Sequence, residues 1–117
     1  MVPRAKLPQL IKGIKEVATR YHFDTLSFGH AGDGNLHVNI LKGDMSDDDW
    51  NHKLKDGVRE IFELTVSLGG TLSGEHGIGL VQKEYMSIKY TEAHFALWRG
   101  IKKVFDPNGI LNPGKIF

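Results

Sequence analysis

The stretch FGHAGDGNLHVN, residues 28–39, decides the fold of this 117-residue chain. Its centre, residues 31–35, has the length of a hairpin turn and contains the Asp-Gly dipeptide that favours positive φ. Residues 23–28 before it have the composition of a short strand, and residues 36–40 after it alternate apolar and polar side chains. The stretch therefore predicts an antiparallel β-hairpin.

The alternation in the second strand separates its two faces. Apolar residues at every second position form one side, so His37 and Asn39 lie together on the other side. Asn39 on this side can face water or contact a substrate. His30 and His37 flank the turn, and we expect these two imidazoles to approach each other.

Two amphipathic helices are predicted around the hairpin. From Pro3 to about Arg20, apolar residues recur at helical spacing, with charged residues on the opposite side. A second helix begins after Ser46, whose side chain caps backbone donors, and Gly69-Gly70 ends it. The residues of its buried stripe are Trp50, Leu54, Val58, Ile61, Phe62, Thr65 and Leu68.

The rest of the chain is predicted to be loop and helix. A glycine-rich stretch runs to Gly79, and a short helical segment follows through Val81, Tyr85 and Met86. Thr91 caps a last helix, which ends at the turn formed by residues 106–109. The residues expected to face inward from this helix are Phe95, Trp98, Ile101, Val104 and Phe105.

This order of elements predicts one α+β domain, residues 1–117, with a small antiparallel sheet covered on one face by helices. Two strands alone are only marginally stable in water. A third strand would have to come from residues 2–4 or 70–73. Without one, the open edge is expected to pair with a second copy of the chain, giving a homo-oligomer, or with another part of a longer protein.

Composition excludes several classes of function. A net charge of +1, with the charged residues scattered evenly, gives no basic field for a nucleic-acid partner. No segment approaches the ~20 apolar residues of a membrane span, and the amino terminus lacks the apolar stretch of a signal peptide. Because the chain has no cysteine, thiolate metal sites and thiol nucleophiles are excluded, and we expect a cytoplasmic protein.

A second polar cluster, residues 73–77 (SGEHG), complements the hairpin turn. Two neutral imidazoles and one carboxylate are a recurring catalytic metal set, because they leave a coordination position open. His30, His37 and Glu75 can supply it, provided that the fold brings them together, and such donors suit zinc, manganese or iron. The sequence gives equal weight to a structural alternative, in which both histidines only make hydrogen bonds at the turn.

His76 directly follows Glu75, and neighbouring side chains on an extended or turning backbone diverge. The two residues are therefore expected to have different roles. An unperturbed imidazole has a pKa near ~6.5 and accepts a proton at neutral pH, so His76 is a candidate base if Glu75 holds a metal. Asp33 and Asn35 are interpreted as turn formers, whose side chains satisfy nearby backbone groups.

Three segments resemble the carboxyl-terminal signatures of FAD-linked oxidases. They are residues 28–39, residues 70–79 (GTLSGEHGIG) and residues 106–115 (DPNGILNPGK). The resemblance covers essentially the whole chain and is closest to the branch of glycolate oxidase flavoprotein subunits, D-lactate dehydrogenases and D-2-hydroxyglutarate dehydrogenases. It implies a ferredoxin-like α+β cap region, and the oxidation of a 2-hydroxy acid to a 2-oxo acid with hydride transfer to FAD.

The resemblance also implies roles for individual residues. The divalent-metal ligands are expected to be His30, His37 and Glu75. Asn39 resembles a residue that polarises the substrate, and His76 resembles the base that takes the proton of the hydroxyl group. The implied partner is a small 2-hydroxy acid, oriented by the metal.

The chain departs from this family in length. Family members are several times longer, and their amino-terminal FAD-binding domain has no counterpart in these residues. The resemblance places Asn112 and Lys115 in the segment that returns toward the flavin. Without the FAD-binding domain, the chain alone is expected neither to bind FAD tightly nor to turn over substrate. Two alternatives stay open: a stand-alone metal-binding module or metallohydrolase with the same three ligands, and a non-catalytic oligomerising fragment.

Overall fold

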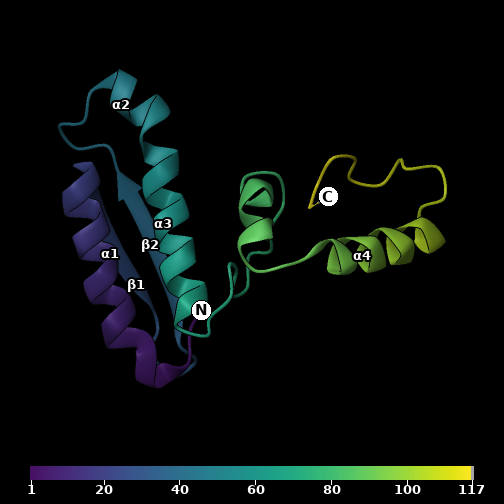
Figure 1. Cartoon of the computed structure of the whole chain (residues 1–117), viewed down its shortest axis with the longest axis horizontal. Helices are drawn as coiled ribbons and strands as arrows, with labels where there is room; N and C mark the ends of the chain where they lie inside the picture. Colours follow the sequence, from purple (N-terminus) through teal and green to yellow (C-terminus); the bar gives the residue numbers. More distant parts are fainter. Residues whose placement is uncertain (117) are drawn as a thin grey trace.

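A computed structural model of the chain describes residues 1–116 and shows helices covering one face of a two-stranded antiparallel sheet (Figure 1). In chain order the elements, with η for 3-10 helices, are η1 (Arg4–Lys6), α1 (Leu7–Tyr21), β1 (Asp24–His30), β2 (Asn35–Leu41), α2 (Asp47–His52), α3 (Leu54–Ser67), η2 (Lys83–Ile88) and α4 (Glu92–Phe105). In Figure 1, α1 and α3 run alongside each other in front of the hairpin. The predicted α+β class is confirmed.

The hairpin forms because its turn can adopt the required backbone. β1 and β2 pair along their whole length, with Phe28 opposite His37. Gly34 closes the turn at φ +69°, and a Cβ at this position would lie 1.9 Å from the carbonyl oxygen of Val2. Only glycine fits there, because the backbone is left-handed and the amino-terminal segment passes too close for a side chain. Both predicted strands are confirmed, and each extends to the turn.

The inner face of the sheet packs against α1 and α3. Ile14 of α1 is 1% exposed and belongs to a core cluster. The buried members of this cluster are Val2, Leu10, Ile14, Val17, Ala18, Phe23, Met45 and Ile61, and the β2 residues that pack on it are Leu36, Val38 and Ile40. The predicted alternation in β2 is therefore confirmed. If β2 were paired with β1 one residue out of register, the side chain of His37 would point into this core. Burial of the apolar face therefore fixes the register of the two strands.

The helix predicted after Ser46 is divided into two. Ser46 caps α2 as predicted, and its hydroxyl accepts a hydrogen bond from the backbone N–H of Asp49 at 3.1 Å. However, α2 ends at His52, and a separate helix, α3, begins at Leu54. The Ser46 cap therefore belongs to the short helix α2, while the predicted stripe continues in α3, where Ile61 is buried in the core.

The predicted inward face of the last helix is wrong for most of its length. Ile101, Val104 and Phe105 are 50%, 76% and 78% exposed. Phe95 and Trp98, near the start of α4, do pack against a second cluster, whose buried members are Leu72, Tyr85 and Met86. In Figure 1 α4 points away from the sheet, and its later turns meet no other helix or strand within residues 1–116. Periodicity predicted an apolar stripe correctly, but it carries no information about what covers the stripe.

No third strand forms among residues 1–116. The backbone N–H of Val2 donates to Gly34 and that of Thr71 donates to Met1, each at 2.9 Å, but these bonds do not continue as a ladder. Val81, predicted within a helical segment, instead lies exposed before η2. The radius of gyration is 16.0 Å, against about 13 Å for a compact domain of this size. The difference reflects the carboxyl-terminal part, which extends away from the sheet.

Asp106 ties the end of α4 to the segment that follows. Its carboxylate accepts hydrogen bonds from Lys102 Nζ at 2.6 Å and from the backbone N–H groups of Ile110 and Leu111 at 2.9 and 3.1 Å. The hydrogen bond from the Lys102 ammonium, followed by those from the two backbone groups, holds the pKa of Asp106 below its usual range. The ionised form of Asp106 is therefore the one that closes this turn.

This lowered pKa predicts that the turn opens in acid. A carboxylate with a folded-state pKa below its unfolded value of about 3.9 contributes stability above that pH and loses it as the pH falls through the folded-state pKa. We expect the amides of Ile110 and Leu111 to lose hydrogen-exchange protection between about pH 4 and pH 2. In Asp106→Ala, which removes both acceptor oxygens, they should be unprotected already at pH 7. Asp44→Ala, at an exposed position, is the control, and unchanged protection in Asp106→Ala would contradict this account.

Candidate functional site

Three predicted metal ligands come together at the turn end of the sheet. His30 ends β1, His37 lies in β2, and Glu75 lies in the loop between α3 and η2. One potential ligand atom from each lies within 4.8 Å of the other two. His37 Nε2 is 2.9 Å from Glu75 Oε1, and the rings of His30 and His37 are 5.9 Å apart between centroids. The predicted approach of the two imidazoles across the turn is confirmed.

The spacing of these donors fits a single divalent cation. Ligand atoms about 2.1 Å from a zinc ion stand roughly 3.4 Å apart in a tetrahedral arrangement. The pair His37–Glu75 is even closer, at 2.9 Å, and all three ligand atoms lie within 4.8 Å of one another, so only modest side-chain rotation would be needed to surround one ion. Such rotations are open to His30, because its side chain is exposed. The nitrogen and oxygen donors suit zinc, manganese or iron.

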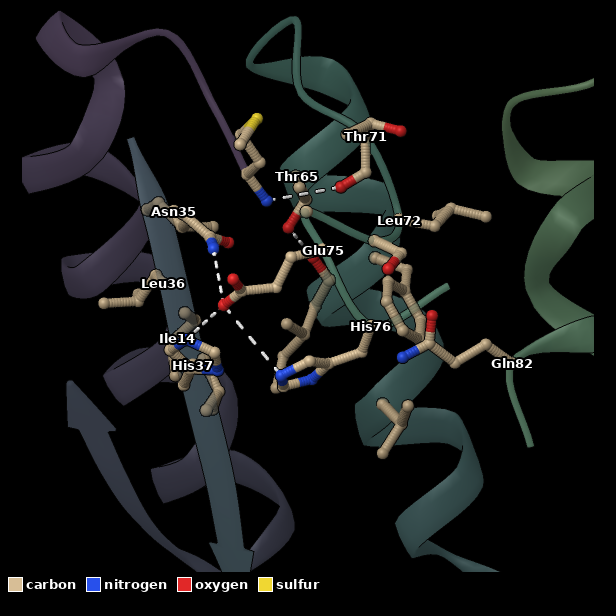
Figure 2. A pocket seen from close by; sticks show the side chains of 18 of the residues that line it. Ile14, Asn35, Leu36, His37, Thr65, Thr71, Leu72, Glu75, His76 and Gln82 are labelled. Atoms are coloured by element: carbon tan, nitrogen blue, oxygen red, sulfur yellow. Dashed lines mark hydrogen bonds and ion pairs between the residues drawn. The ribbon is translucent and has the colours of Figure 1, made fainter. Parts of the chain in front are cut away.

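Asn35 positions the carboxylate of this cluster. It is 7% exposed, and its Nδ2 donates a hydrogen bond to Glu75 Oε1 at 3.1 Å (Figure 2). Gly74 passes over it so closely that a Cβ there would lie 2.2 Å from Asn35 Oδ1. Glycine at this position therefore lets the loop approach β2. The sequence predicts only a turn-forming role for Asn35, although the alternation of β2 places it on the same face as His37.

His76 lies beside the same carboxylate. Its Nε2 is 3.9 Å from Glu75 Oε1, and its ring centroid is 5.0 Å from that of His37. The expectation that Glu75 and His76 diverge is wrong, because the loop bends at these residues and both side chains line one cavity. The His76 side chain is 73% exposed. An accessible imidazole in this position can exchange protons with both a bound molecule and water.

Phe28 supports the orientation of His37 on the outer face of the sheet. The two residues are opposite each other in the register, and their rings stack with centroids 5.2 Å apart and planes 16° from parallel. The sequence pattern did not single out this contact. The cross-strand pairing is the signal that could have found it, because directly opposed side chains lie on the same face.

A cavity of about 250 Å³ lies between β2, α3 and the loop of residues 71–76, and its lining includes His37, Glu75 and His76 (Figure 2). His30 is not among its lining residues. Its polar lining residues are Asn35, His37, Asn39, Thr65, Thr71, Ser73, Glu75, His76 and Gln82. The rest of the lining comes from apolar residues of α1, β2 and α3, from Leu72 and Gly74 of the loop, and from Met1. The Met1 ammonium group donates to the carbonyl oxygen of Thr71 at 3.4 Å. No lysine or arginine lines this cavity among the described residues. A cavity of this size and character suits a small organic ligand.

The sequence matches the family described as FAD linked oxidases, C-terminal domain, over residues 1–116. The chain belongs to this family. This oxidase domain is 39% identical over 116 residues to the glycolate oxidase subunit GlcD of Bacillus subtilis, covering 99% of the chain and 24% of that protein. It is 40% identical over 115 residues to the D-2-hydroxyglutarate dehydrogenase of Stutzerimonas stutzeri, covering 96% and 25%.

A further relative is the D-lactate dehydrogenase of Anaerostipes hadrus, 36% identical over 116 residues, which cover 99% of the chain and 24% of that protein. The chain spans about a quarter of the length of these curated relatives. The resemblance drawn from the three signature segments is therefore confirmed. None of the helices described in this oxidase domain is long and apolar enough to cross a membrane.

The other predicted site residues, Asn39, Asn112 and Lys115, lie outside the cluster of His30, His37 and Glu75. Asn39 is exposed and lines the cavity two positions along β2 from His37. Asn112 and Lys115 lie beyond α4, where the Lys115 N–H donates to the Asn112 carbonyl at 3.3 Å in the predicted turn. Neither of them lines the cavity, so the structure does not bring them to the histidine cluster. Their role in flavin binding stays a prediction.

Proposed function

We propose that this oxidase domain carries the metal-binding and proton-accepting part of an FAD-dependent enzyme that oxidises a 2-hydroxy acid to a 2-oxo acid. The observation that carries the proposal is the convergence of His30, His37 and Glu75, two of which line a small cavity together with His76. The relatives support it, because glycolate, D-lactate and D-2-hydroxyglutarate, the acids in their names, are all 2-hydroxy acids.

Each residue has a defined task in this proposal. A divalent cation held by His30, His37 and Glu75 would supply a Lewis acid that lowers the pKa of a nearby hydroxyl group. His76 accepts the hydroxyl proton on its imidazole, and the Asn39 amide orients the substrate by hydrogen bonding. Asn35 keeps the carboxylate of Glu75 in place through its hydrogen bond at 3.1 Å.

The flavin belongs to the parts of the enzyme outside this chain. FAD would accept the hydride from carbon 2 of the acid, and Asn112 and Lys115 would face it from the carboxyl-terminal segment. The isolated chain should therefore bind a metal but not oxidise the acid. Because a chain without cysteine suits a reducing compartment, the proposal places the enzyme in the cytoplasm.

A chimeric enzyme tests the proposal. This chain would replace the matching quarter of the Stutzerimonas stutzeri D-2-hydroxyglutarate dehydrogenase, and anaerobic bleaching of the flavin absorbance would be followed after adding glycolate, D-lactate or D-2-hydroxyglutarate. We expect at least one acid to reduce the flavin. A chimera that retains FAD and leaves it oxidised with all three acids would contradict the proposal. Ester hydrolysis by the isolated chain, lost in Glu75→Ala, would instead favour a metallohydrolase.

We also propose that the isolated chain self-associates through its sheet. The sheet has two strands, so each strand has one edge without a partner within residues 1–116. The outer face beside that edge exposes Leu26, Phe28 and Leu41. Open edges next to apolar side chains favour pairing with another strand. Light scattering over a range of concentrations should show a mass that rises above the monomer, and a constant monomeric mass would reject the idea.

A further inference from the structure

The imidazole ring of His37 has one polar partner within residues 1–116. This partner is Glu75, whose Oε1 lies 2.9 Å from His37 Nε2. Histidines that bind a metal usually donate their other ring N–H to a carboxylate, a backbone carbonyl or water, and this hydrogen bond fixes the orientation of the ring. No carboxylate or carbonyl of the described chain plays this part for His37, so its orientation depends on other contacts.

Phe28 supplies such a contact from the neighbouring strand. It lies directly opposite His37 in the register, and the two rings stack with centroids 5.2 Å apart and planes 16° from parallel. The rings of His30 and His76 also lie near His37, but they are inclined to it by 77° and 42°. Only the ring of Phe28 is stacked on that of His37. The imidazole therefore cannot turn about its Cβ–Cγ bond without losing this contact.

The position of Phe28 separates this contact from core packing and from the cavity. Phe28 is 53% exposed and belongs to neither core cluster. It is not among the residues that line the cavity. Within the described chain, the one ring that it contacts is that of His37. Replacing its side chain should therefore leave the core intact and act on the cluster through His37.

We propose that Phe28 is a positioning residue of the metal site, whose stacked ring holds His37 with Nε2 directed toward the ion beside Glu75. This inference rests on the proposed function, in which His37 is a ligand. A side chain that is already fixed in the free protein loses less conformational freedom when the ion binds. Phe28 therefore raises the affinity for the ion without touching it.

The Zn²⁺ affinity of matched variants, measured by competition with a chromophoric chelator, tests this inference. Phe28→Leu keeps an apolar side chain but removes the ring, and it should weaken Zn²⁺ binding by about 3- to 10-fold, as expected for the loss of one aromatic pair. Phe28→Tyr keeps the ring and should bind Zn²⁺ like the wild type. Leu26→Ala removes another exposed apolar side chain from the same face of β1 and should also bind like the wild type.

Proton NMR of the metal-free chain gives a second readout, because the ring current of Phe28 shifts the carbon-bound ring protons of His37 upfield. This shift should persist in Phe28→Tyr and decrease in Phe28→Leu. An unchanged shift or wild-type Zn²⁺ affinity in Phe28→Leu would overturn the inference. So would a loss of affinity that Phe28→Tyr shares or that Leu26→Ala reproduces, and none of these results would affect the proposed function. Failure of the wild-type chain to bind Zn²⁺ would count against the proposed function and this inference together.

Discussion

Glu75→Gln should lower the affinity of the chain for Zn²⁺ by at least about 100-fold. Replacing a group that merely supports a ligand costs about 10- to 100-fold in metal affinity, so loss of a ligand itself should reach or exceed the upper value. The substitution keeps the shape of Glu75 but removes its charge, and a neutral amide is a poor substitute for a carboxylate on zinc. Competition with a chromophoric chelator measures the change.

Matched variants separate ligation from general effects of charge and folding. His37→Ala should weaken Zn²⁺ binding in the same way, because His37 Nε2 and Glu75 Oε1 are 2.9 Å apart and would share one ion. Glu16→Gln removes an exposed carboxylate from α1, and His52→Ala removes an exposed imidazole from α2. Both controls should bind Zn²⁺ like the wild type. Wild-type affinity in Glu75→Gln would refute the assignment of this carboxylate as a ligand.

The local parts of the fold were predictable because they depend on short-range patterns. The Asp-Gly turn and the alternation after it predicted the hairpin, and the structure pairs Phe28 with His37 as such a hairpin requires. The cap at Ser46 also follows from local chemistry, because a hydroxyl group reaches a backbone N–H three residues along the chain. In the same way, a turn of known length brings His30 close to His37.

The features that were missed depend on residues distant in sequence. The apolar stripe of α4 has the right spacing, but only the fold shows that Val104 and Phe105 meet no other element of the described chain. Asn35 reaches Glu75 across 40 positions of sequence, and Gly74 permits this contact through a close approach that no local pattern encodes. Glu75 and His76 line the same cavity because the loop bends at these residues. On an extended backbone the two side chains would point in opposite directions.

His76→Ala should slow flavin reduction in the chimeric enzyme by about 10²- to 10⁴-fold, the usual cost of losing a general base. The imidazole of His76 is accessible and lies within 3.9 Å of the Glu75 carboxylate, so it can take a proton from a molecule held at the cluster and release it to water. Anaerobic stopped-flow spectroscopy of the flavin, with the acid at saturating concentration, measures this step separately from binding.

The Zn²⁺ affinity of the same variant distinguishes a base from a ligand. A base contributes to the proton transfer but not to holding the ion, so His76→Ala should bind Zn²⁺ within a few-fold of the wild type while losing most of its rate. If His76 were a ligand, affinity and rate would fall together, as expected for Glu75→Gln. His52→Ala should change neither quantity, and equal FAD content in all chimeras would show that they have folded. Flavin reduction at the wild-type rate in His76→Ala would mean that the proton leaves by another route.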